Sequence, residues 1–132
     1  MLVDLRAANM TLREALGATM MLLASLSMRR GTNGEQLAAV AVLDELGKII
    51  AAGGISPAFV TLLNELRHRL LWLLISCQLP SELPEKIIGL CNGIFAGRTE
   101  SEAGHRTLCA AKPGYIEVSR EVLARLPPGT FA

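Results

Sequence analysis

The sequence predicts an all-α, or nearly all-α, protein: a four-helix bundle followed by a short C-terminal strand and helix. Two observations favour this class. The 132 residues are 51% hydrophobic but only 4% aromatic, and a mixture rich in Leu and Ala favours helices because these side chains lose little rotamer freedom there. Apolar stripes at helical spacing also begin directly behind capping residues. We therefore expect four helices within residues 12–96.

The first two predicted helices share one capping pattern. Thr11 is followed three residues later by Glu14, the spacing of a capping box, and the apolar stripe behind it predicts a helix over residues 12–30. The same arrangement begins again at Thr32 and predicts a second helix over about 34–52, ended by a pair of glycines. Both helices are expected to turn their apolar stripe toward the core.

The third predicted helix is the most apolar part of the chain. Ser56 followed by Pro57 is typical of a helix start, and apolar residues then recur at alternating spacings of four and three up to Cys77. Its last turns, residues 70–75, read LLWLLI and are apolar on every side. A helix of this kind must be enclosed, so we expect it to be the central helix of the bundle.

A bundle this small has too little material to cover the apolar end of that helix from all sides. We therefore expect Leu71, Trp72 and Ile75 to contact a partner, since Trp is enriched at interface hot spots. The competing interpretation is that all three are ordinary core residues. The sequence thus favours a bacterial-type, non-enzymatic helical interaction module, an adaptor, chaperone or regulatory inhibitor, that binds a protein partner and forms a homodimer.

The chain is expected to change character after residue 97. A fourth, shorter helix is predicted over about 81–96, which completes a bundle over residues 1–97. A polar loop then opens the segment 98–132. Within it, residues 115–118 are predicted as a short strand, and Ser119 can cap a helix that runs to Leu126.

The charge balance disfavours nucleic acid as a partner. Thirteen basic and twelve acidic residues give a formal net charge of +1, so no long-range field gathers phosphate groups. The alternative function is a small dimeric DNA-binding transcriptional regulator that reads DNA with residues 115–126. In that interpretation Arg120 and Arg125 would contact the nucleic acid.

A cytoplasmic location without membrane insertion is expected. The uncharged runs at residues 15–28 and 70–81 are shorter than the roughly 20 residues that a spanning helix needs. Asp4 and Arg6 interrupt the start of the chain, which is unlike a secretory signal. Three widely spaced cysteines, an odd number, fit reduced thiols better than a disulfide framework.

No catalytic, cofactor or metal site is predicted, and no small-molecule substrate is evident. The candidate metal ligands are Cys77, Cys91, His105 and Cys109, but only His105 and Cys109 approach the close spacing typical of structural zinc sites. His105 beside Cys109 is also the one arrangement in which a base lies close to a nucleophile. Two core cysteines and one in the tail explain the same residues.

Overall fold

The computed structural model of the protein describes residue 3, residues 10–112 and residues 119–132. Its internal contacts divide the chain into two units, residues 1–78 and residues 79–132. The division falls after Gln78, whereas the sequence predicts a boundary after residue 97. Each unit has its own helices and its own buried side chains, so the two are described separately.

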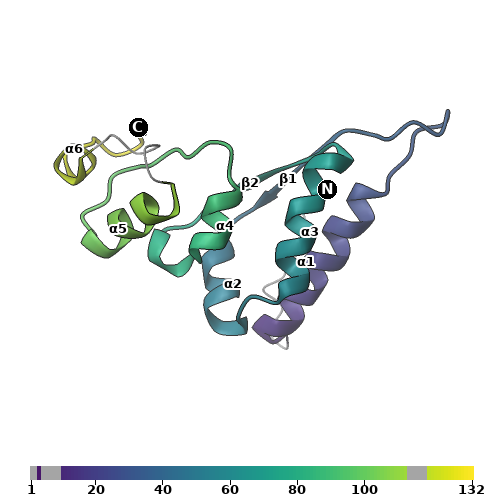
Figure 1. The fold of residues 1–132 in the computed structure, drawn as a ribbon, viewed down its shortest axis with the longest axis horizontal. Helices are drawn as coiled ribbons and strands as arrows, with labels where there is room; N and C mark the ends of the chain where they lie inside the picture. The colour runs from purple at the N-terminus through teal and green to yellow at the C-terminus, as the bar shows by residue number, and fades with distance from the viewer. Residues whose placement is uncertain (1–2, 4–9, 113–118) are drawn as a thin grey trace. The chain divides into compact units, whose positions relative to one another are not determined.

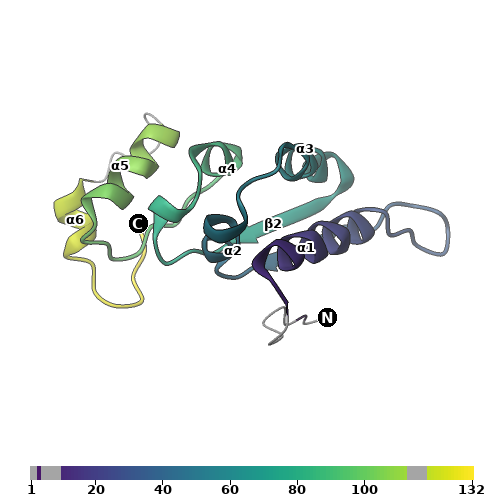
Figure 2. The same ribbon diagram turned by 90° about the horizontal axis from the view of Figure 1, so that it is seen from below.

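The predicted all-α four-helix bundle is wrong, because the first unit contains a parallel β-sheet of two strands. In chain order its elements are α1 (Leu12–Ser27), β1 (Ala39–Leu43), α2 (Leu46–Gly53), α3 (Pro57–Leu66) and β2 (Leu71–Ile75). The helices α2 and α3 form the long crossover connection that a parallel pair requires. Figure 1 shows α1, α2 and α3 next to the strand pair, and Figure 2 shows the same elements from below.

The first helix begins where the capping box predicts. The backbone N–H of Glu14 donates to the Thr11 hydroxyl (3.3 Å), and the Glu14 carboxylate accepts from the Thr11 backbone N–H (2.7 Å) and hydroxyl (2.8 Å). These hydrogen bonds to its charged form lower the pKa of Glu14. The face of α1 that is turned inward carries Ala15, Leu16, Thr19, Leu23 and Ser27.

The second predicted helix, over residues 34–52, is a reversal, a strand and a shorter helix. Gly31 donates its backbone N–H to the Glu35 carbonyl (2.8 Å), and Arg30 forms an isolated antiparallel bridge with Gln36. Strand β1 follows, with the sequence AVAVL. Alternating Val and Ala fit a pleated strand. Because all five residues of this run are apolar, it is compatible with the two-residue period of a strand as well as with the 3.6-residue period of a helix. Of the helix predicted over residues 34–52, only the part that falls in α2 is helical.

The third predicted helix ends earlier than its apolar stripe. The Ser56 hydroxyl caps α3 by accepting from the Phe59 backbone N–H (3.2 Å), as predicted. After Leu66 the chain forms a 3₁₀ turn, η1 (Arg67–Arg69), and Leu70 adopts a left-handed conformation (φ 52°) that ends the helix. The LLWLLI run is therefore mostly strand β2, because a short run that is apolar throughout fits a strand as well as a helix.

The core of the first unit lies between the helices and one face of the strand pair. Phe59 is completely buried, and the other apolar side chains with less than 9% exposure come from α1, α2, α3 and β2. The buried apolar residues are Ala15, Leu16, Leu23, Leu46, Ile50, Phe59, Leu63, Leu66 and Leu71. This core holds the strand pair in place from one side.

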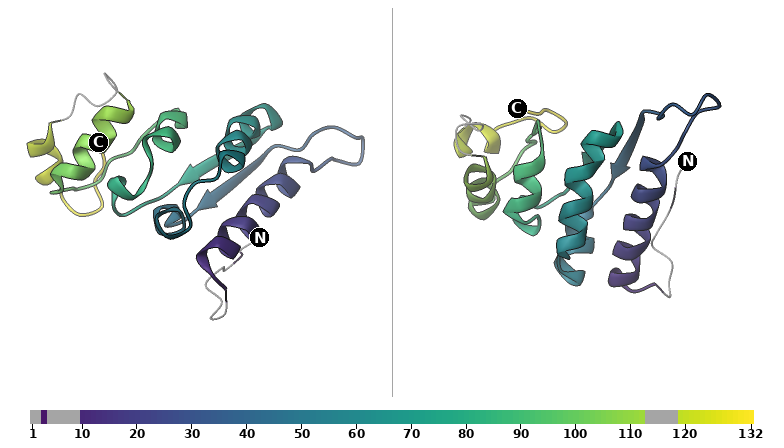
Figure 3. Two further views of the ribbon diagram at one scale, coloured as in Figure 1. Left: turned by 60° about the horizontal axis from the view of Figure 1, so that its bottom comes forward. Right: turned by 45° about the vertical axis from the view of Figure 1, so that its right-hand side comes forward.

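The second unit is built from short helices. Its elements are η2 (Pro80–Glu82), α4 (Glu85–Leu90), α5 (Glu102–Ala111) and α6 (Arg120–Ala124). The single helix predicted over residues 81–96 is wrong in extent, because within this range the chain is helical only in η2 and α4. Figure 3 shows α4 and α5, in green, as neighbours in two further views, and the two helices contact each other.

Helix α5 occupies the segment that the sequence predicts as a polar loop. Ser101 caps it by accepting from the Gly104 backbone N–H (3.1 Å), and Leu108 is buried in the unit's core. The helix predicted after Ser119 is present as α6, whereas the strand predicted over 115–118 lies outside the described residues. The sequence predicts a loop here because the first half of α5 contains few apolar residues and therefore shows no clear apolar stripe at helical spacing.

Candidate protein-binding face

The strand pair presents one apolar face that no described residue of the first unit covers. The parallel register pairs Val40 with Trp72 and Val42 with Leu74, so these four side chains form a block of two by two. Their exposed fractions are 61%, 71%, 66% and 57% respectively. We call this block, Val40, Val42, Trp72 and Leu74, the open face. Parallel sheets are almost always covered on both faces, so the open face is unusual.

The opposite face of the same strands packs on the helices. Along β2 the burial alternates residue by residue: Leu71 is buried, while Leu73 and Ile75 are half-buried between exposed neighbours. Along β1 the alanines and Leu43 are the half-buried positions. Successive side chains of a strand point to opposite faces, so the helices on one side leave the other side open.

The hydrogen bonding of the strands leaves both outer edges available. Ala39 donates its backbone N–H to the Leu70 carbonyl (3.0 Å), and Ser76 donates to the Leu43 carbonyl (3.0 Å). The parallel ladder therefore uses alternate residues, and the backbone groups of Val40, Val42, Leu71, Leu73 and Ile75 point to the outer edges. Among the described residues no third strand pairs with either edge.

Acidic and amide side chains meet at the carboxyl ends of the two strands. The Ser76 hydroxyl donates to Asp44, and it accepts from the Glu45 backbone N–H (3.3 Å). Gln78 donates its amide to the Glu45 carboxylate (2.7 Å), which also pairs with Lys48 (2.7 Å). The contacts between the two strand ends join residues 31 to 33 positions apart in sequence and fix where the two strands end.

The amino ends of the strands carry basic residues. The amide of Gln36 donates to the carbonyl of Ser27 (3.2 Å) and to the carbonyl of Arg69, which ties the end of α1 and the start of both strands together. Arg69 pairs with Glu65 (3.0 Å), and Arg67 donates to the His68 ring (3.2 Å). Because Arg69 is matched by Glu65 and Glu45 by Lys48, the charges at the two ends without an ion pair among the described residues include Arg67 before β2 and Asp44 after β1.

The predicted partner-binding residues fall on two different faces. Trp72 is the most exposed residue of the open face, whereas Leu71 is buried (2% exposed) and Ile75 is half-buried on the covered face. Sequence reasoning also missed Val40, Val42 and Leu74. The signal for Val40 and Val42 is the period-two pattern of the run AVAVL. Leu74 follows from Trp72, because residues two apart in a strand share a face.

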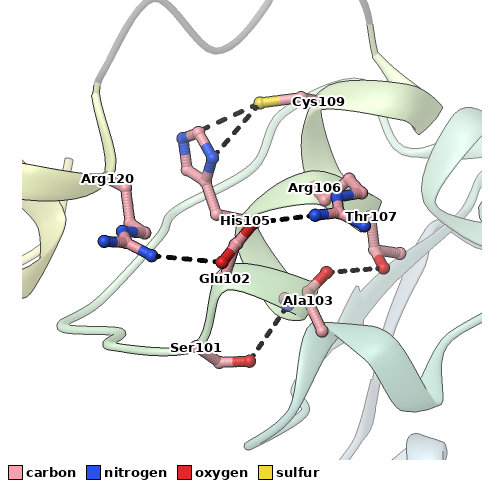
Figure 4. Close-up of polar contacts among 9 residues, drawn as sticks. Ser101, Glu102, Ala103, His105, Arg106, Thr107, Cys109 and Arg120 are labelled. Atoms are coloured by element: carbon pink, nitrogen blue, oxygen red, sulfur yellow. Dashed lines mark hydrogen bonds and ion pairs between the residues drawn. The ribbon is translucent and has the colours of Figure 1, made fainter.

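The residues of the alternative DNA-binding interpretation lie in the second unit. Arg120 begins α6 and its guanidinium lies 3.6 Å from the Glu102 carboxylate, and Arg125 follows the last residue of this five-residue helix (Figure 4). Glu102 also pairs with Arg106 (2.7 Å). Of the two predicted DNA contacts, Arg120 is therefore already matched by the acidic Glu102.

The candidate residues His105 and Cys109 lie in contact on α5, one helical turn apart. The sulfur lies 3.8 Å from Nδ1 and 3.7 Å from Nε2 of the imidazole (Figure 4). Nearly equal distances to both nitrogens mean that the thiol is not aimed at one acceptor. Burial raises the pKa of the Cys91 thiol, and the charge of Lys112 opposes this shift in part. No group of three metal-ligating side chains occurs among the described residues.

Comparison of the chain with protein-family models, with curated proteins and with solved structures finds no match. In the described part of the chain, every helix is too short or too polar to cross a bilayer.

Proposed function

We propose that the protein is a non-enzymatic interaction module, of the adaptor, chaperone or regulatory-inhibitor kind, that binds apolar protein surfaces with its open face. The observation that carries the proposal is the exposure of Val40, Val42, Trp72 and Leu74 on one face of a parallel strand pair. An aromatic residue surrounded by aliphatic ones is typical of an interface core.

The sequence of the strands supports a covered native state. Neither AVAVL nor LWLLI contains a charged residue or a proline, the devices with which edge strands usually avoid unwanted pairing. An apolar strand pair without such protection is a liability for a chain that works alone. A protein bound to the open face would reduce the exposed apolar surface, because it excludes water from these side chains.

The proposed location is the cytoplasm. None of the three cysteines forms a disulfide bond, which fits a reducing compartment. The DNA-binding alternative receives no support from a specific observation, since Arg120 is matched by Glu102.

The test is a selection of peptide ligands on the full chain. Peptides displayed on phage are expected to yield amphipathic sequences that bind wild-type protein and fail to bind the double variant Trp72→Ser/Leu74→Ser. A matched control is Val122→Ser/Phe131→Ser, which changes two exposed apolar side chains of the second unit (52% and 63% exposed) and should leave binding unchanged.

Trp72 provides a direct readout of that binding, because it is the only tryptophan of the chain. A bound peptide should shift its emission to shorter wavelength and protect it from acrylamide quenching. The proposal is refuted if selected peptides bind the Trp72→Ser/Leu74→Ser variant as tightly as they bind wild-type protein.

A further inference from the structure

We propose that the open face binds the open face of a second copy of this chain, with the strands of the two copies running antiparallel. This inference rests on the proposed function, since it names one partner for the same surface. A two-fold axis that lies in the interface and crosses the strands generates the arrangement. It brings β1 over β1 of the second copy and β2 over β2.

The open face is self-complementary in its chemistry. Its four side chains contain no charged group, so a copy of the same face satisfies it without burying an unpaired charge. In the antiparallel arrangement Trp72 lies over Leu74 of the second copy, and Val40 lies over Val42. Sheets that pack face to face interdigitate side chains in this way.

The charges at the two ends of the sheet select the antiparallel orientation. Arg67 lies before the start of β2, and Asp44 follows the end of β1. Arg69 and Glu45 lie beside them but are already paired with Glu65 and Lys48. Within the described residues no ion pair involves Arg67 or Asp44. An antiparallel dimer places the basic end of each copy over the acidic end of the other, twice by symmetry. A parallel dimer would place like charges together, which costs binding free energy.

The area of the open face predicts a weak dimer. From the exposed fractions of Val40, Val42, Trp72 and Leu74, each copy contributes about 400 Å² of apolar surface. Two copies bury about 800 Å², which is below the 1,200–2,000 Å² of stable interfaces. An interface of this size is typical of weak or transient association, so we expect an equilibrium in which dimer forms only as the concentration rises.

Sedimentation equilibrium of the full chain from about 1 µM to 1 mM tests the inference, with acrylamide quenching of Trp72 measured on the same samples. We expect a monomer–dimer equilibrium in which quenching falls as dimer forms. Trp72→Ser should weaken the dimer by at least about 30-fold, because the residue is replaced in both copies. The control Phe131→Ser, at an exposed position of the second unit, should leave the equilibrium unchanged.

Charge reversal tests the orientation. Arg67→Glu or Asp44→Arg alone should weaken the dimer about tenfold at low salt, because each creates two like-charge contacts. An equimolar mixture of the two variants should associate about as well as wild-type protein, since the heterodimer restores opposite charges at both ends. The control Arg106→Glu, on α5, should have no effect, and 1 M salt should remove the differences.

The outcomes separate this inference from the proposed function. A chain that stays monomeric at 1 mM, with Trp72 fully quenchable, overturns the self-association; peptides that still bind at Trp72 would then leave the proposed function standing. A dimer that tolerates Trp72→Ser overturns the inference, because the open face is not its interface. A dimer that needs Trp72 but does not regain affinity in the mixture of charge variants overturns the antiparallel orientation.

Discussion

Leu71 and Trp72 are adjacent in sequence, and the structure predicts opposite consequences for replacing them. Leu71 is 2% exposed against the helices, whereas Trp72 is 71% exposed on the open face. Threonine suits both positions as a strand residue, so Leu71→Thr and Trp72→Thr form a matched pair. In an α-helix enclosed at the bundle centre, both side chains would be core, and the larger one would cost more.

The magnitudes follow from burial. Leu71→Thr removes buried methyl groups and introduces a hydroxyl, so the free energy of unfolding should fall by about 3 kcal/mol. Less than a third of the Trp72 side chain is buried, roughly 60 Å² of apolar surface, so Trp72→Thr should cost about 1–1.5 kcal/mol. The smaller residue should therefore cost at least twice as much as the larger one.

Urea unfolding followed by far-UV circular dichroism is the assay, because the only tryptophan is lost in one variant. The protein should be kept below 1 µM, where a weak dimer contributes nothing to stability. Val42→Thr, a replacement of nearly equal volume at a 66% exposed position, is the control and should change little. The reasoning is refuted if Trp72→Thr destabilises the protein as much as Leu71→Thr.

Three further predictions concern ionisable groups. The carboxyl of Glu14 should titrate below its ordinary pKa, and Thr11→Ala should return it toward that value in an NMR titration. Its contribution to the stability of α1 is complete above the ordinary pKa and is lost as the pH falls through the lowered one. The Cys91 thiol, with its pKa raised by burial, should be alkylated at pH 8 more slowly in the folded protein than in urea, and Lys112→Met should slow it further; faster reaction in the folded state would contradict this. Duplex DNA should not be retarded by the protein even at low salt, because the net charge is +1 and Arg120 is paired; retardation that weakens steeply with salt would contradict this.

Much of the local structure could be predicted from the sequence. The helix starts behind Thr11, Ser56 and Ser119 are present, and the first two have the predicted side-chain caps. A cap joins atoms three residues apart, so its free energy depends only on the local sequence. The start of α5 behind Ser101 followed the same rule, but its polar residues hid the helix.

The candidate site could be predicted only in part. Trp72 was identified because a run of apolar residues demands cover, which holds for a strand as it does for a helix. The same reasoning predicts Leu71 and Ile75 as contacts, because a helix apolar on every side exposes all three residues, whereas in the strand these two point toward the core. Val40 and Val42 come from a segment 30 or more positions away, and only the strand register brings them beside Trp72 and Leu74.

The sequence by itself determined the caps, the apolar runs and the near-neutral charge of this protein. Only the tertiary structure decided that the two apolar runs are strands and not helices. A five-residue strand gains its hydrogen bonds from a partner, and here the partner of Ala39 is Leu71, 32 positions along the chain. Local propensity does not contain that interaction, because strand pairing is stabilised by contacts that exist only once the chain has folded.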